Sequence, residues 1–193
     1  MSEDQVIRHC APTLAGLKTG NIFNASYQSN EELEFSLTTL NETLERRGLR
    51  AVCLRRNEDT VLVYVFRPQL LHMDLNSPDA KELLQGFGYV PKDPDSCIAH
   101  LAERIAPGQS FPHEIGLFLG YPPEDVRGFI KYGGKHCKMC GYWKVYGDAK
   151  AAEKRFAQFT KCTCVYLKRL QGGAGLEKLA VRQNALKKRQ HTQ

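Results

Sequence analysis

The sequence has no run of about 18 consecutive apolar residues, and this absence excludes a helix that could cross a bilayer. It also lacks the basic-then-apolar pattern of a signal peptide, because the first residues, Met1 to Gln5, are acidic, so we expect a cytoplasmic protein. Internal repeats and long linkers are missing too. With 193 residues, of which 42% are hydrophobic and 25% charged, the chain predicts one globular domain over residues 1–181.

Acidic residues are absent from the last twelve positions, which hold Arg182, Lys187, Lys188 and Arg189. The formal net charge is +6, but without these four basic residues it is only +2 for residues 1–181. We predict that residues 182–193 form a basic, disordered tail. A folded nucleic-acid binder distributes lysine and arginine along a helix or groove, so a mainly terminal excess argues against a nucleic-acid partner.

Cysteine occurs seven times, an odd number, which with the expected cytoplasmic setting argues against a disulfide framework. Cys137 and Cys140 form a C-x-x-C pair, and Cys162 and Cys164 lie on a predicted helix. These four thiols are candidate ligands for zinc or iron. Because a C-x-C pair points its sulfurs about 200° apart on a regular helix, both could bind one ion only if that helix ended or kinked there. There are two alternatives to metal binding. Cys137 and Cys140 exchange as a redox pair, or the cysteines are free thiols, buried or at the surface.

Helical and strand patterns interleave without regular βαβ repetition, and this predicts an α+β fold with a small mixed or antiparallel sheet and helices mainly on one face. The predicted strands are residues 21–27, 49–55, 60–66 and 141–146, the second and third forming a hairpin in a covered sheet. The predicted helices are a short one ending before Pro12, then residues 30–47, 79–85, 96–105, 113–119, 123–132 and 149–171, with residues 176–181 ambiguous. Residues 10–20 are expected to form a loop, because they contain a proline and two glycines.

The stretch from Phe111 to Ile130 is the densest in aromatic and apolar residues, and His113 and Glu114 stand near its start. The zinc-hydrolase pattern H-E-x-x-H fails, because Leu117 occupies the place of the second histidine. Two interpretations remain. His113 and Glu114 are catalytic or ligand-contacting residues, or His113 is a hydrogen-bonded residue in apolar surroundings while Glu114 caps backbone amides at a helix start.

Cys10 precedes the turn around Pro12, where a thiol could be exposed. Paired with His113 it would provide the thiolate and imidazole of a cysteine-dependent enzyme. The alternative is a buried, inert thiol, since free cysteine behaves as a small hydrophobe.

Along residues 141–146, Tyr142, Lys144 and Tyr146 share one face of the predicted strand, while Trp143 takes the other. One face has to pack on the core. An exposed face of tyrosines with a lysine would suit a planar anionic ligand or a protein partner. The ligand-binding candidates are Tyr121, Tyr142, Trp143, Lys144 and Tyr146.

Three segments resemble one known bacterial family: the run from Cys10 to Lys18, the run from Phe111 through Val126 that includes Pro112-His113-Glu114-Ile115-Gly116, and the run Gly141-Tyr142-Trp143-Lys144-Val145-Tyr146-Gly147. The chain is similar to the family called domain of unknown function 3793 up to about Val181. The resemblance implies a bacterial, cytoplasmic setting and supplies no activity.

Two classes of function remain open. The first is a small-molecule- or metal-binding protein, with an enzyme among the options, whose pocket lies between residues 111–121 and residues 141–146 with Cys10 nearby. The second is an interaction module whose exposed aromatic surface docks another protein.

Overall fold

The structure is a computed structural model, and it describes residues 2–90, 93–106 and 110–182. Within these residues nine helices accompany a three-stranded antiparallel sheet and a two-stranded one, so the α+β prediction is confirmed. None of the described helices is long and apolar enough to span a bilayer. Residues 183–193 of the predicted tail lie outside the described residues.

The chain forms two compact units. Unit 1 comprises residues 1–69 and 161–193, and unit 2 comprises residues 70–160. Two helices run through the boundaries, α3 (Pro68–Leu75) and α8 (Ala149–Gln171). The single domain expected for residues 1–181 stays a prediction.

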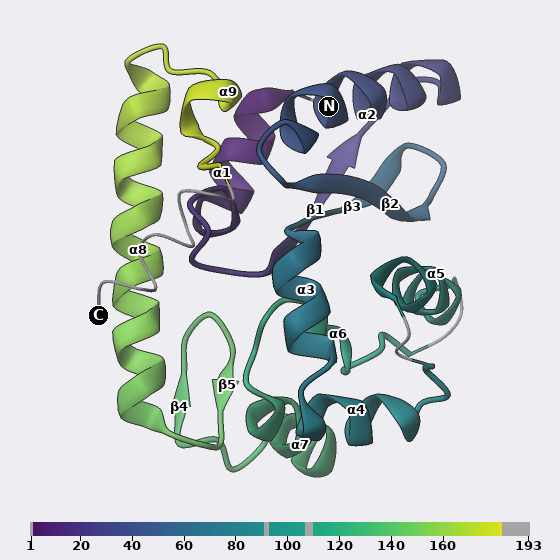
Figure 1. The fold of residues 1–193 in the computed structure, drawn as a ribbon, viewed down its shortest axis with the longest axis vertical. Coiled ribbons are helices and arrows are strands. Elements are labelled where there is room, and N and C mark those ends of the chain that lie inside the picture. The colour runs from purple at the N-terminus through teal and green to yellow at the C-terminus, as the bar shows by residue number, and fades with distance from the viewer. Residues whose placement is uncertain (1, 91–92, 107–109, 183–193) are drawn as a thin grey trace. The chain divides into compact units, whose positions relative to one another are not determined.

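Unit 1 is built on an antiparallel sheet in which β3 lies between β1 and β2 (Figure 1). Its elements are α1 (Glu3–Leu14), β1 (Gly20–Ser26), α2 (Asn30–Glu45), β2 (Arg50–Arg56), β3 (Thr60–Phe66) and α9 (Leu176–Leu179). β3 is buried from Val61 to Phe66, as the apolar run predicts for a strand paired on both edges and covered on both faces. α1 and α2 pack on the face that carries Phe23, Ala51 and Val63.

Helix α1 corrects the sequence prediction, because it continues through Pro12 to Leu14 and includes the first five residues of the expected loop. Proline removes one backbone hydrogen bond from a helix interior. The last turn persists here because Cys10, Ala11 and Leu14 are buried in the core of unit 1. The carbonyl groups at the end of α1 also accept hydrogen bonds, since the Arg67 guanidinium donates to the oxygens of Thr13 and Leu14, each at 2.7 Å.

Unit 2 consists of shorter elements. They are α4 (Pro78–Gln85), α5 (Pro94–Arg104), α6 (Ile115–Phe118), α7 (Pro123–Tyr132) and the hairpin of β4 (Met139–Cys140) and β5 (Lys144–Val145), followed by the first part of α8. Asp93 caps α5 and Asp148 caps α8 through side-chain oxygens. α3, which begins at Pro68, was not predicted.

The strand predicted over residues 141–146 is wrong in length. β5 contains only Lys144 and Val145, and it pairs with Met139 and Cys140 in a tight hairpin. Trp143 and Val145 are buried, while Tyr142 is exposed. The hairpin is short because Gly147-Asp148 turns the chain into α8.

Candidate functional site

A recess of about 270 Å³ opens in unit 2 where α6, α7 and the β4–β5 hairpin meet. We call it the aromatic recess. It is lined by His113, Ile115, Gly116, Tyr121, Asp125, Val126, Phe129, Cys140, Gly141, Trp143 and Lys144. The structure thus brings together the two segments that the sequence singles out, residues 111–121 and residues 141–146.

The joint between these segments is the carboxylate of Asp125, a buried residue in the first turn of α7. One oxygen accepts from Trp143 Nε1 at 2.7 Å, and the other accepts from the backbone nitrogens of Tyr146 at 2.7 Å and Gly147 at 2.8 Å. A carboxylate buried with three donors is fully solvated by the protein. The Asp125 side chain therefore joins the hairpin to α7 through three hydrogen bonds.

Aromatic stacking completes the wall of the recess. The rings of Tyr121 and Trp143 stack with centroids 4.8 Å apart at 27°, and the Tyr121 hydroxyl donates to the Tyr142 carbonyl at 3.3 Å. Burial raises the pKa of Tyr121 to about 12, so its phenol stays protonated at neutral pH. Gly116 leaves room for this arrangement, because a Cβ there would lie 2.7 Å from Val126 Cγ2.

His113 is exposed and lines the aromatic recess. Its ring meets Phe129 edge-on, with centroids 4.9 Å apart. The imidazole therefore lies against an aromatic surface and is open to solvent, which suits a group that contacts a ligand. A catalytic role for it stays a prediction.

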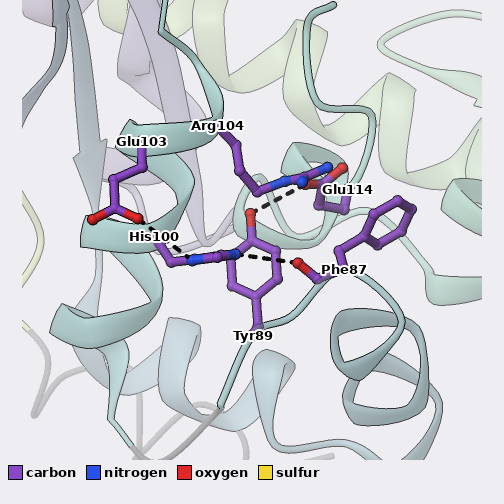
Figure 2. Close-up of polar contacts among 6 residues, drawn as sticks. All are labelled: Phe87, Tyr89, His100, Glu103, Arg104 and Glu114. Atoms are coloured by element: carbon purple, nitrogen blue, oxygen red, sulfur yellow. Dashed lines mark hydrogen bonds and ion pairs between the residues drawn. The ribbon is translucent and has the colours of Figure 1, made fainter. Parts of the chain in front are cut away.

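Glu114 corrects the prediction of a helix cap. It stands at the start of α6 but makes no side-chain hydrogen bond to the backbone there. Its buried carboxylate faces α5 instead, where Oε1 accepts from Arg104 Nε and, at 3.2 Å, from the Tyr89 hydroxyl (Figure 2). This carboxylate raises the pKa of Arg104, while burial and the same carboxylate raise the pKa of Tyr89.

Further contacts surround this carboxylate. Arg104 lies over the ring of Phe87 at 5.1 Å, and His100 Nε2 lies 3.1 Å from the Phe87 carbonyl. Figure 2 shows the Tyr89 hydroxyl and the Arg104 side chain converging on Glu114. Glu114 thus connects the start of α6 to α5, and it does not line the aromatic recess.

Tyr89 and Arg104 were missed by the sequence analysis. They precede Glu114 by 25 and 10 residues, and no local spacing pattern relates the three. The available signal was the apolar environment of Glu114, because a glutamate inside such a run requires a cation or several donors.

The other ligand candidates divide between different surfaces. Lys144 lines the aromatic recess, and its ammonium donates to the Gly134 carbonyl at 2.6 Å. Tyr142 is exposed and its ring contacts Phe156 and Phe159 of α8. Tyr146 stacks on Tyr132, outside the aromatic recess. The predicted face of Tyr142, Lys144 and Tyr146 is thus divided among three environments.

The four candidate metal ligands fall in both units. Cys137 and Cys140 belong to unit 2, and Cys162 and Cys164 to unit 1. α8 runs unbroken past Cys162 and Cys164, so the kink that a shared ion would require is not present. Cys162 donates to the Ala11 carbonyl at 3.6 Å, while Cys164 is exposed. Within the described residues, no three His, Cys, Asp or Glu side chains gather closely enough to hold a metal ion.

Cys10 is not exposed, contrary to one of its two interpretations. It is fully buried in the core of unit 1, and burial raises the pKa of its thiol to about 12. A thiol with this pKa is protonated at neutral pH and is a poor nucleophile. The alternative of a buried, inert thiol fits this environment.

A larger recess of about 450 Å³ in unit 2 shares Tyr121, Asp125 and Trp143 with the aromatic recess. Its lining also includes the charged residues Asp74, Glu124, Asp148 and Arg155. Because Asp125 uses both oxygens for the hairpin, the shared wall offers this second recess mainly aromatic surface.

A family model described as "Protein of unknown function (DUF3793)" matches residues 6–180. Neither the curated proteins nor the solved structures give a match to the chain. The match includes residues 111–121 and 141–146, the two segments that the aromatic recess brings together.

Proposed function

The chain belongs to the DUF3793 family, whose description assigns no activity, and we propose from the geometry that it is a bacterial cytoplasmic protein that binds a small planar organic anion in the aromatic recess. The observation that carries this proposal is the lining itself. His113, Tyr121, Phe129 and Trp143 place aromatic rings around about 270 Å³, and the Lys144 side chain supplies a cation.

The aromatic side chains of the recess are the reason why we propose a planar ligand. Aromatic faces and edges are best satisfied by a flat partner, and a volume of this size accommodates one or two fused rings. Tyr121 and Trp143 already stack, so the wall is preorganised and its side chains lose little freedom when a ligand binds.

The polar side chains of the recess are the reason why we propose a negatively charged ligand. Lys144 keeps donor capacity beyond its bond to Gly134, because an ammonium has three N–H groups. Asp125 is the acidic residue of the lining, and its carboxylate accepts three hydrogen bonds from Trp143, Tyr146 and Gly147, so its charge is largely compensated. An anionic group beside Lys144 and His113 therefore meets a net favourable field.

The test uses the indole N–H of Trp143, the only tryptophan in the chain. It gives one cross-peak in a ¹⁵N–¹H spectrum, which reports on the recess wall. We expect 2-naphthoate to shift this peak saturably and to bind more tightly than 2-naphthalenemethanol, which has the same rings without the charge.

Variants sharpen the result. Lys144→Met should weaken naphthoate binding about tenfold and leave the neutral alcohol unchanged, because it removes one charge-assisted contact. His113→Ala should weaken both ligands, and Lys150→Met, an exposed lysine of α8 outside the recess, should change neither. Equal affinities for the two probes, or no saturable shift, would contradict the proposal.

Native mass spectrometry of protein purified without oxygen tests for a resident ligand. An additional small-molecule mass that is lost in His113→Ala supports the proposal. A ligand-free monomer that dimerises would favour the interaction module instead, for which the exposed rings of Phe111 and Tyr142 are the candidate surface.

A further inference from the structure

Positive charge is concentrated in one segment of unit 2. The net charge of +2 over residues 1–181 conceals this, because residues 126–147 contain five basic and no acidic residues, whereas residues 1–125 contain eleven basic and eighteen acidic ones. The five are Arg127, Lys131, Lys135, Lys138 and Lys144. The segment covers most of α7 and the whole β4–β5 hairpin.

The hairpin folds this segment around a shallow recess of about 250 Å³, which we call the basic recess. It is lined by Glu124, Arg127, Gly128, Lys131, Tyr132, Tyr146 and Gly147. Tyr132 is 41% exposed and stacks on Tyr146, with centroids 5.8 Å apart at 21°. Gly128 permits this packing, because a Cβ there would lie 2.3 Å from Tyr146 Cγ.

Three lysines belong to the segment that forms this recess. The Lys131 ammonium lies 5.0 Å from the Tyr132 ring centroid, and the Lys138 ammonium donates to the carbonyl of Gly147, a lining residue, at 2.8 Å. Lys135 is exposed in the turn that follows α7. Arg127 already pairs with Glu82, so the three lysines carry the argument.

We propose that the basic recess binds single-stranded nucleic acid, with a base stacked against Tyr132 and phosphates beside Lys131, Lys135 and Lys138. Exposed aromatic rings flanked by lysines provide the two interactions that single strands offer, base faces and a phosphate backbone. A duplex keeps its bases stacked inside and cannot use Tyr132. This site is separate from the aromatic recess and does not depend on the proposed small anion.

Fluorescence anisotropy of the full chain with labelled U12 and dT12 at low salt tests the proposal. Lys131→Gln with Lys135→Gln should weaken binding about tenfold and lower the slope of log K against log salt by about 0.7 for each lysine that meets a phosphate. Tyr132→Ala should weaken binding by about tenfold with the slope unchanged, because stacking is not ionic. Thermal melts check that each variant folds.

The matched control is Lys150→Gln with Lys154→Gln, two exposed lysines of α8 that line none of the basic recess. All variants keep the four basic residues of the last twelve positions, so non-specific binding by these is constant. Control and recess variants that lose affinity equally would overturn the proposal. So would an unchanged affinity in Tyr132→Ala, or a duplex of U12 with A12 that binds as tightly as U12.

Discussion

The two units bury charge of opposite sign. Among the residues that the structure describes, the buried ionisable side chains of unit 1 include the cations Lys18 and Arg67, whereas the buried acids Glu114 and Asp125 both belong to unit 2. Each sign selects a different set of partners. A buried cation requires acceptors, which backbone carbonyls at a helix end supply, and a buried carboxylate requires N–H or O–H donors.

The difference explains how each unit is closed. Arg67 donates to Thr13 and Leu14 at the end of α1 and, at 2.9 Å, to the Val181 carbonyl, so it holds two remote pieces of backbone together. In unit 2, Asp125 joins α7 to the β4–β5 hairpin, and Glu114 joins the start of α6 to α5. The aromatic recess lies where α6, α7 and this hairpin meet.

The largest expected effect is that of Arg67→Met. Three backbone carbonyls lose a buried donor, and we expect the free energy of unfolding to fall by about 4 kcal/mol. Urea unfolding followed by circular dichroism measures this. Arg46→Met, an exposed arginine after α2, is the control and should change stability by less than about 0.5 kcal/mol. A small loss in Arg67→Met would show that the cation does not close unit 1.

Asp125→Asn should cost about 2 kcal/mol, because an amide keeps one acceptor but turns a donor toward one of the N–H groups that the carboxylate binds. Unfolding followed by Trp143 fluorescence reports the loss at the hairpin. Glu153→Gln, which neutralises an exposed acid of α8, provides the comparison. If Trp143 fluorescence and stability were both unchanged, the hairpin would not depend on this carboxylate.

The smallest effect is a pH dependence in unit 1. Burial lowers the pKa of Lys18 from 10.5 to about 8, so between these values the folded chain binds fewer protons than the unfolded chain and the free energy of unfolding rises with pH. The raised pKa of Cys10 acts oppositely, but only above its ordinary value of 9.0. We therefore expect a rise of up to about 1.4 kcal/mol between pH 8 and 9.

Urea unfolding at pH 7.5, 8, 8.5 and 9 measures this rise. Lys18→Met should remove it, whereas Lys178→Met, an exposed lysine of α9, should retain it. Equal slopes in the wild type and in Lys18→Met would show that the amine titrates in the folded chain as it does in water.

Local patterns predicted much of unit 1 and less of unit 2. The spacing of Leu33, Leu37, Leu40 and Leu44 predicts α2 and its buried face, and the continuous apolar run from Val61 predicts a covered central strand. Pro12 misled the prediction of α1, because a local rule for ending helices does not count the burial of the turn that follows. In unit 2 the elements are so short that a few residues decide each boundary, as in the hairpin after Cys137.

The sequence by itself singled out residues 111–121 and 141–146, which border the aromatic recess, but it did not determine the whole lining, since Asp125, Phe129 and Cys140 lie outside these segments. Only the tertiary structure decided the partners of the charged side chains. Glu114 meets Arg104 and Tyr89, Asp125 meets Trp143, and Arg67 meets the end of α1, over separations of 10 to 54 residues. The physical reason is range: periodicity and turn preferences act over a few residues, whereas a buried charge is stabilised by whichever donors or acceptors the folded chain brings to it.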